Sequence, residues 1–256
     1  MSNLQIEQFT AHSDNFCVLI HDPETGLTAS IDAPEEAAIL EALKRRGWKL
    51  THIFTTHHHG DHVEANLALK KRFGTEIIGP SDERSKIPGI DRAVRHGERF
   101  AFGNFEVEVI STPGHTAGEI SYHIPAAKVA FTGDTLFSLG CGRLFEGTPA
   151  MMLKSLQRLM ALPGDTEIYC GHEYSESNAR FALTVDPDNS ALKERAKEIM
   201  ALREAGLPTL PTTILREMAT NPFLRAHDPS IRRNLNMDSA SDEAVFAEIR
   251  KRKDNF

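Results

Sequence analysis

The sequence predicts an α/β fold in which a layered domain at residues 1–173 is followed by a helical domain at residues 174–256. Short apolar runs alternate with amphipathic helical segments over the first part of the chain, and this mixture is typical of layered α/β domains. After about Tyr174 the alternation typical of strands ends, and polar-faced helical segments separated by proline-containing breakers replace it. A chain of 256 residues is long enough for a main domain with an addition.

The individual elements follow from runs of β-branched and aromatic residues, from helical periodicity and from residues that favour helix ends. The first helix is predicted to start with Pro34 and two glutamates and to stop at Gly47. No strand is expected after Tyr174. We expect strands at residues 15–20, 27–32, 50–55, 105–110, 120–124, 128–132 and 167–170. We expect helices at residues 34–46, 63–73, 150–161, 189–204 and 242–253.

Composition and charge restrict the classes of partner. The chain has 29 Lys and Arg against 36 Asp and Glu, and a formal net charge of −7 disfavours non-specific binding to nucleic acid. No apolar run approaches the roughly 18 residues needed to cross a bilayer, and no signal-peptide pattern is evident. The three cysteines are widely spaced and odd in number, which favours a reducing compartment. We therefore expect a cytoplasmic protein without membrane or nucleic-acid partners, and a monomer is the working expectation.

The run Thr-His-His-His-Gly-Asp-His at residues 56–62 carries the clearest chemical signal. Residues two apart on an extended segment point to the same side, so His57 and His59 are predicted to hold one ion while His58 points away. Asp61 and His62 follow a glycine turn and are predicted to hold a second ion. The alternatives are an adventitious histidine tract and a helix N-cap at Asp61. The metal site is preferred because the run joins a predicted strand to a predicted helix, where sites are commonly built.

Three further residues with metal-binding side chains, His115, Asp134 and His172, each follow a predicted strand and a glycine. Loops at one edge of a sheet converge in space, so the two histidines are predicted to complete the ion sites. Asp134 is predicted to bridge both ions through its two oxygens. Taken singly, each residue is more typical of a turn. Imidazole and carboxylate donors without thiolate suit zinc, iron or manganese.

The order His-x-His-x-Asp-His, followed by His115, Asp134 and His172, resembles the metallo-β-lactamase superfamily over residues 1 to about 173. The resemblance implies a four-layer αβ/βα sandwich with a dinuclear site at one edge of its sheets. It also implies two divalent ions per chain as cofactors, zinc ahead of iron or manganese. By the family pattern the first ion is held by His57, His59 and His115, the second by Asp61, His62 and His172, and Asp134 bridges them.

Other segments resemble one family within this superfamily, glyoxalase II or hydroxyacylglutathione hydrolase. These segments are residues 137–148, 171–174, 221–225 and 250–254, so the resemblance covers nearly the whole chain. It implies cleavage of S-(2-hydroxyacyl)glutathione, such as S-D-lactoylglutathione, to a 2-hydroxy acid and glutathione, the second step of methylglyoxal detoxification. It implies catalytic roles for Asp61 and Asp134. The residues that it implies for contact with glutathione are Arg143, Phe145, Tyr174, Arg250 and Lys253.

Four residues near the implied substrate site have more than one interpretation or depart from the family pattern. The family often has an aromatic hydroxyl where this chain has Phe145, so one hydrogen bond worth about 1 kcal/mol is lost there. Cys141 is interpreted as a small residue in a tight glycine-flanked loop rather than as a reactive thiol. The basic pair Arg250 and Lys253 has the alternative interpretation of a solvated helix end.

A thioester suits such a site chemically. A metal-bound water with a pKa of about 7 is a nucleophile at neutral pH, and a thiolate with a free pKa near 8.5 leaves without a strong acid. One competing hypothesis is a persulfide dioxygenase with a single iron; the seven predicted ligands and residues 174–256 count against it. A nucleic-acid-processing hydrolase is disfavoured by the net charge of −7. A purely structural metal is disfavoured because structural zinc sites usually have four closed ligands.

Overall fold

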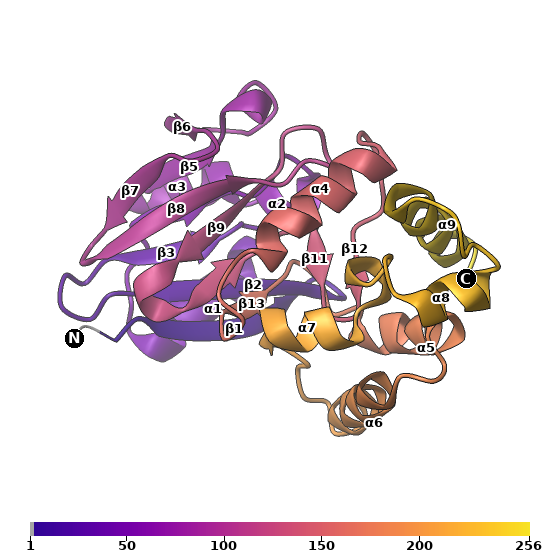
Figure 1. The fold of residues 1–256 in the computed structure, drawn as a ribbon. Helices are drawn as coiled ribbons and strands as arrows, with labels where there is room; N and C mark the ends of the chain where they lie inside the picture. Colours follow the sequence, from indigo (N-terminus) through magenta and orange to yellow (C-terminus); the bar gives the residue numbers. More distant parts are fainter. Residues whose placement is uncertain (1–2) are drawn as a thin grey trace. The chain divides into compact units, whose positions relative to one another are not determined.

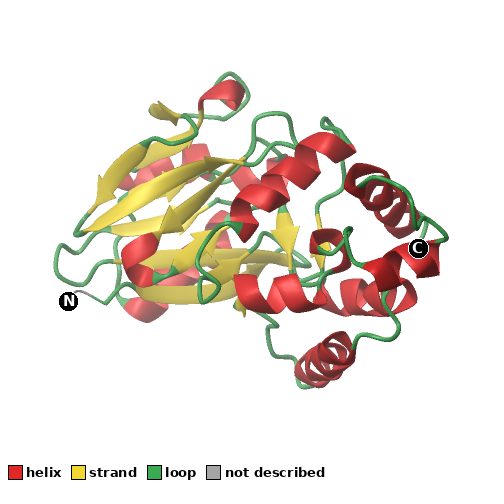
Figure 2. Cartoon of the chain, in the orientation of Figure 1, coloured by secondary structure: helices red, strands yellow, loops and turns green. Residues whose placement is uncertain are grey.

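The protein, here a computed structural model, is described over residues 3–256 and divides into two compact units. Unit 1 consists of Met1–Ser111 and Thr116–Gly133, and unit 2 consists of Thr112–His115 and Asp134–Phe256. Both units contain strands and helices (Figure 2). The predicted domain boundary after residue 173 is a different division of the chain and stays a prediction.

Unit 1 contains a mixed sheet in the order β1-β2-β3-β4-β5-β6. The first three strands pair antiparallel, whereas β3 to β6 pair parallel. Every residue of β2 except the last is buried, which requires cover on both faces of the sheet. The strands are β1 Gln5–Ala11, β2 Asn15–His21, β3 Thr28–Ile31, β4 His52–Phe54, β5 Glu76–Pro80 and β6 Arg92–Val94.

Helices cover one face of this sheet. Ile39 and Leu43 of α1 and Leu69 of α3 belong to the same buried cluster as Leu19 of β2 and Ile53 of β4. Apolar side chains from helix and strand thus form a continuous core on this face. The helical elements of unit 1 are α1 Glu36–Arg46, α2 Gly60–Val63, α3 Asn66–Phe73, η1 Ser81–Glu83 and η2 Pro125–Ala127.

A second group of strands covers the other face of the sheet. The antiparallel neighbours are β10-β9-β8-β7. The ring of Phe54 in β4 packs edge-on against Phe100 and Phe102 of β7, with centroid separations of 5.2 and 5.4 Å. The buried hydroxyl of Tyr122 in β9 donates to the Thr55 carbonyl oxygen at 2.7 Å, so a polar contact adds to the apolar one. The strands are β7 Arg99–Phe102, β8 Phe105–Ser111, β9 Ile120–Ile124 and β10 Val129–Phe131.

Unit 2 consists mainly of helices, with two small antiparallel strand pairs (Figure 1). The side chains of Thr148, Asn189 and Ser241 cap helices α4, α6 and α9, which fixes where these helices begin. The strands are β11 Leu136–Phe137, β12 Gly140–Cys141, β13 Glu167–Tyr169 and β14 Thr212–Thr213. The helices are α4 Pro149–Met160, α5 Ser175–Val185, α6 Ser190–Glu204, α7 Ile214–Thr220, η3 Pro222–Leu224, α8 Pro229–Leu235 and α9 Asp242–Asp254.

Parts of the predicted secondary structure are wrong. The helix predicted at residues 63–73 is interrupted, because the backbone of Ala33 accepts from the Ala65 N–H and donates to the His62 carbonyl. Those two groups are consequently lost to the helical hydrogen-bond ladder. The region after Tyr174 does contain a strand, the two-residue β14, which pairs with β13.

The first helix also starts later than predicted. Glu35 occupies the extended N-cap position of α1, so Pro34 lies before the helix rather than in its first turn. Among the described residues no helix combines the length and apolar character that a membrane span requires.

Phe54→Ala should lower the free energy of unfolding of unit 1 by about 3–5 kcal/mol, because it removes the ring from a fully buried aromatic cluster. Urea unfolding followed by fluorescence of Trp48, the single tryptophan, measures the change. Leu67→Ala, at a side chain that is 58% exposed, is the control and should shift stability by about 0.5 kcal/mol or less. A Phe54→Ala midpoint as high as that of the control would contradict the packing argument.

Candidate metal centre and substrate-binding residues

In unit 1, potential metal ligands gather in the loop that follows β4. The ring centroids of His57 and His59 lie 4.8 Å apart, and those of His57 and His62 lie 4.1 Å apart. A nitrogen of His57 lies within 4.8 Å of a nitrogen of His59 and also of His62. His62 Nε2 lies 3.7 Å from Asp61 Oδ2. Three imidazoles and a carboxylate of this one loop therefore converge on a small volume.

The buried carboxylate of Asp32 fixes the start and the end of this loop. It accepts hydrogen bonds from the Thr56 N–H at 2.7 Å, the Thr56 hydroxyl at 2.9 Å and His62 Nδ1 at 2.8 Å. With Nδ1 donating to Asp32, His62 presents Nε2 as its metal-binding nitrogen. Asp32 follows β3 in the left-handed conformation, with φ of 57°, which turns its carboxylate toward the loop after the neighbouring parallel strand.

Glu83 is a second buried carboxylate that holds the loop. Its Oε2 accepts from both the backbone N–H and Nδ1 of His58 at 2.8 Å, so this histidine has a partner different from that of His62. Its Oε1 accepts from the Thr116 hydroxyl at 2.5 Å and from the Gly118 N–H at 3.0 Å. Glu83 thereby ties the histidine loop to the segment after β8 that precedes β9.

Asp61 is held by an amide from β2. The buried Asn15 donates through Nδ2 to the Asp61 carbonyl oxygen at 3.1 Å and to its Oδ2 at 3.2 Å. The Asp61 side chain is 44% exposed, so its carboxylate is oriented from one side and open on another. Sequence reasoning did not identify Asn15, Asp32 or Glu83 as functional. For Asn15 and Asp32 the available signal was a polar residue at one end of an apolar strand, which is too common to be specific, and Glu83 of η1 lacked even that signal.

In unit 2, Asp134 lies between two histidines. Its Oδ2 is 3.4 Å from His115 Nε2 and 3.3 Å from His172 Nε2, and all three side chains are nearly fully buried. These separations exceed the usual N–H···O distance of about 2.7–3.2 Å. They match the separation of roughly 3.3 Å between two ligands of a tetrahedral ion with metal–nitrogen bonds of about 2.0–2.1 Å. The spacing is therefore compatible with a set of metal ligands.

His115 is oriented in the same manner as His62. Its Nδ1 donates to the carbonyl oxygen of Arg143 at 2.8 Å, which leaves Nε2 toward Asp134. Donors of this kind, imidazole nitrogens and carboxylate oxygens, suit divalent zinc, iron or manganese. Unit 1 thus carries four of the seven predicted ligands and unit 2 carries three. The residues present fit the metal ions that the family resemblance implies.

Two aromatic side chains lie beside the histidines of unit 2. The Tyr174 ring stacks on His172, with a centroid separation of 4.8 Å and an interplanar angle of 2°. Phe145 meets His115 edge-on at 5.2 Å. Tyr174 is 39% and Phe145 61% exposed, which is unusual for large rings and leaves apolar surface beside the ligands.

The predicted basic residues differ in exposure. The Arg143 side chain is 57% exposed, with Nε 3.5 Å from Asp254 Oδ1. Arg250 is buried and donates to the Cys141 carbonyl oxygen at 2.8 Å and to Asp254 at 2.9 Å. Lys253 donates to the Ser177 hydroxyl at 2.9 Å. A solvated helix end is thus the wrong interpretation for Arg250, which joins α9 to the strand pair β11–β12.

Burial changes the pKa of two groups in this region. Desolvation raises the pKa of the Cys141 thiol to about 11, although the nearby Arg250 opposes the shift. Cys141 is consequently a protonated, packed side chain at neutral pH rather than a reactive thiolate. Desolvation, followed by the charge of Arg250, lowers the pKa of Lys253 to about 8. The ammonium of Lys253 therefore loses its proton at a much lower pH than an ordinary lysine.

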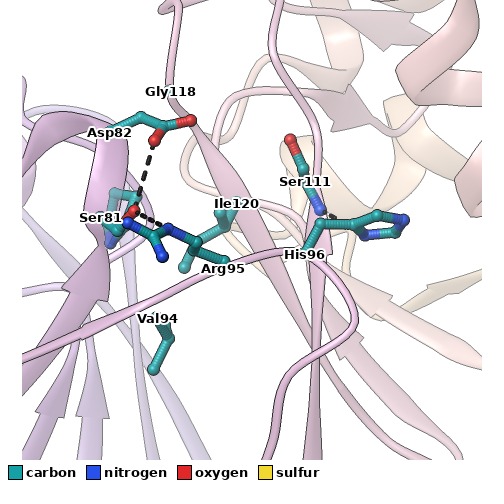
Figure 3. Close-up of a pocket in the computed structure, with 9 residues that line it drawn as sticks. Ser81, Asp82, Val94, Arg95, His96, Ser111, Gly118 and Ile120 are labelled. Atoms are coloured by element: carbon teal, nitrogen blue, oxygen red, sulfur yellow. Dashed lines mark hydrogen bonds between the residues drawn. The ribbon is translucent and has the colours of Figure 1, made fainter.

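A surface pocket of about 310 Å³ lies within unit 1 (Figure 3). Arg95 Nε donates to Ser81 Oγ at 3.0 Å, and the Ser111 N–H donates to His96 Nδ1 at 3.2 Å. The side chains of Arg95 and His96 therefore have hydrogen-bond partners within the pocket itself. None of the predicted ligands or substrate-binding residues is among the described residues that line this pocket.

The fold and the donor groups together define a class of protein, one with a layered α/β domain and a metal site of imidazole and carboxylate donors. Comparison with known proteins identifies the same class. The model of the metallo-beta-lactamase superfamily matches residues 14–172, and that of the hydroxyacylglutathione hydrolase C-terminus matches residues 173–256. The crystal structure of ETHE1 from Myxococcus xanthus superimposes with a TM-score of 0.70 and 27% identity, covering 96% of this chain and 90% of that chain.

The relatives narrow the class further. Hydroxyacylglutathione hydrolases of Brucella anthropi and Brucella abortus (strain 2308) are each 69% identical over 253 residues, which is 99% of this chain and 97% and 98% of theirs. The chain therefore belongs to the hydroxyacylglutathione hydrolase family of the metallo-β-lactamase superfamily.

Asp32→Asn should weaken metal binding by about 10- to 100-fold, because the amide has one acceptor oxygen and cannot accept all three hydrogen bonds that the carboxylate accepts from Thr56 and His62. Asn tolerates the left-handed backbone at this position, so the fold should persist. Competition with a chromogenic zinc chelator measures the affinity.

The matched control is Asp188→Asn, at an exposed carboxylate on the surface of unit 2. It should retain the affinity of the unaltered protein. Equal affinities of the two variants would show that Asp32 does not orient a ligand.

Proposed function

We propose that the chain hydrolyses S-(2-hydroxyacyl)glutathione, such as S-D-lactoylglutathione, to a 2-hydroxy acid and glutathione. This reaction is the second step of methylglyoxal detoxification. The observation that carries the proposal is the arrangement in unit 2, where ligand-spaced His115, Asp134 and His172 lie beside the exposed rings of Phe145 and Tyr174. Family membership over the whole chain supports the same activity.

The metal ligands are proposed from the family pattern. Two divalent ions, zinc before iron or manganese, would supply a water acidic enough to be a nucleophile at neutral pH and a positive field for the developing oxyanion. In this proposal the first ion would be held by His57, His59 and His115 and the second by Asp61, His62 and His172, with Asp134 as a ligand that both would share.

The protein's own groups hold protons and orient the substrate. Asp61 and Asp134 are the proposed catalytic carboxylates, and Asn15 keeps Asp61 in one orientation. The buried Asp134 is a suitable proton acceptor during attack on the thioester carbonyl. A thiolate with a pKa near 8.5 departs without protonation, so no strong general acid is needed.

The proposed substrate-binding residues would recognise the glutathione part of the substrate. Phe145 and Tyr174 offer apolar surface, although Phe145 has no hydroxyl for a hydrogen bond to the peptide. Glutathione carries two carboxylates, and the cations proposed to hold it are Arg143, Arg250 and Lys253. Arg143 is the most exposed of the three and the best placed for direct contact.

The proposal extends to the setting of the enzyme. We propose a cytoplasmic monomer without nucleic-acid partners, in keeping with the net charge of −7. A persulfide dioxygenase of the same fold is the alternative activity. It is less well supported, because residues 173–256 match the hydroxyacylglutathione hydrolase C-terminus.

A panel of lactoyl thioesters that differ in the thiol tests the proposed function. We expect kcat/KM for S-D-lactoylglutathione to exceed that for lactoyl-coenzyme A by at least about 100-fold, equal to roughly 2.7 kcal/mol of transition-state binding. Thiol release is followed with a disulfide dye. Oxygen uptake with a glutathione persulfide and no thioester cleavage would establish the alternative.

The pH dependence tests the role of Lys253. Its pKa of about 8 means that the positive charge is present below pH 8 and is lost as the pH rises through that value. kcat/KM for S-D-lactoylglutathione should therefore fall about fivefold between pH 7 and pH 9.5, as one charge-assisted contact disappears from a half-exposed site.

Lys253→Arg keeps the charge at all of these pH values and should remove this fall. Lys251→Arg, at the exposed neighbour, is the matched control and should retain it. Identical pH profiles for both variants would exclude Lys253 from glutathione binding.

A further inference from the structure

The hairpin formed by β11 and β12 lies between two functional positions of the chain. Asp134 comes two residues before β11, and Arg143 comes two residues after β12. The Gly142 N–H donates to the Thr135 carbonyl at 3.2 Å, and a Cβ atom on Gly142 would come within 1.9 Å of the Asp134 carbonyl oxygen. The geometry of the hairpin therefore determines where the segment with Arg143 leaves it.

The turn of this hairpin is strained. Leu139 occupies it with φ of 57°, a left-handed conformation that is unfavourable for a branched side chain. Such a conformation persists only where the surroundings determine it. The Leu139 side chain is fully buried in a cluster with residues of α5 and α6, including Ala182 and Leu192.

Glu217 of α7 holds this turn through a buried carboxylate. Its Oε2 accepts from the Leu139 N–H at 2.8 Å and from Asn221 Nδ2 at 3.0 Å, and its Oε1 accepts from the Thr212 hydroxyl at 2.7 Å. Asn221 Nδ2 also donates to the carbonyl oxygens of Phe137 at 3.2 Å and Gly140 at 3.0 Å. The carboxylate and the amide together bind the backbone of both strands and of the turn.

Other helices of unit 2 contact the same hairpin. Asn178 of α5 donates to the Ser138 carbonyl at 3.1 Å, and Arg250 of α9 donates to the Cys141 carbonyl at 2.8 Å. On the far side of the loop, the N–H groups of Phe145 and Glu146 both donate to the His115 carbonyl at 3.3 Å. The loop at residues 142–146 is thus attached to the hairpin at one end and hydrogen-bonded to the segment that contains His115 at the other.

We propose that Glu217, acting through the β11–β12 hairpin, is a positioning residue that sets the specificity for the thiol part of the substrate. The inference rests on the proposed function, because it assigns the held loop to recognition of the glutathione part. Glu217 touches no substrate in this proposal. It fixes the strained turn, the turn fixes the exit of the loop, and the loop carries Arg143 and Phe145.

Glu217→Gln tests this proposal. A glutamine side chain has one acceptor oxygen, so its NH₂ group takes the place of the other carboxylate oxygen. That NH₂ group faces at least one of the three groups that donate hydrogen bonds to the carboxylate. We expect kcat/KM for S-D-lactoylglutathione to fall at least tenfold, mainly through KM. For the lactoyl thioester of N-acetylcysteamine, which lacks the peptide, we expect a change below twofold.

The ratio of these two constants separates positioning from a general loss of folded protein, which would lower both constants equally. Glu194→Gln, at an exposed carboxylate of α6, is the matched control and should leave the ratio unchanged. Should Glu217→Gln fail to fold, Thr212→Val removes a single donor to the same carboxylate, and it should lower the ratio about twofold to threefold. An unchanged ratio in a folded variant overturns the proposal.

Hydrogen exchange measured by mass spectrometry provides a readout that does not need activity. Amides of residues 136–143 should exchange at least tenfold faster in Glu217→Gln than in the unaltered protein, with the exchange of unit 1 unchanged. Should the unaltered protein cleave neither thioester, the proposed function fails, and exchange alone decides whether Glu217 holds the loop. Faster exchange supports that hold, and unaltered exchange overturns it.

Discussion

A metal-binding histidine almost always donates its other ring nitrogen to a fixed partner, which determines the nitrogen that it presents to the metal, and one predicted ligand in each unit has this arrangement. In unit 1 the partner of His62 is Asp32, which also accepts from Thr56 at the start of the histidine loop. In unit 2 the partner of His115 is the carbonyl oxygen of Arg143. The order of the sheet in unit 1 serves this arrangement, because the parallel pairing of β3 with β4 brings Asp32 beside Thr56.

Buried carboxylates with several donors recur as the means of holding loops. Asp32, Glu83 and Glu217 each accept three or more hydrogen bonds, and each binds at least one group that is distant in sequence. A buried charge without such partners would be strongly destabilising, so each network also stabilises a single loop conformation. Burial raises the pKa of Glu217 despite its three donors, which shows how completely the carboxylate is removed from water.

The sequence signal for the predicted ligands is local. His57, His59, Asp61 and His62 lie within six residues, and the spacing itself states which side chains can converge. Their supporting residues have no such pattern. In the sequence, Glu83 cannot be told from the many glutamates expected on the surface, although in the structure η1 turns it inward. Arg250 likewise looks like part of a solvated basic helix end in the sequence but is buried. Only tertiary packing decides such cases, and it also interrupts the helix predicted at residues 63–73 through the backbone of Ala33.

Part of the positive charge of the proposed glutathione site is neutralised by a nearby carboxylate of this acidic chain. Asp254 lies 2.9 Å from Arg250 and 3.5 Å from Arg143, so one carboxylate partly neutralises two of the three proposed cations. Arg250 is buried and has a second partner in the Cys141 carbonyl, whereas Arg143 is largely exposed. Exchanging an exposed ion pair costs little, because such pairs contribute about 0–1 kcal/mol. In the proposed function, a carboxylate of glutathione would therefore replace Asp254 more readily at the exposed Arg143 than at the buried Arg250.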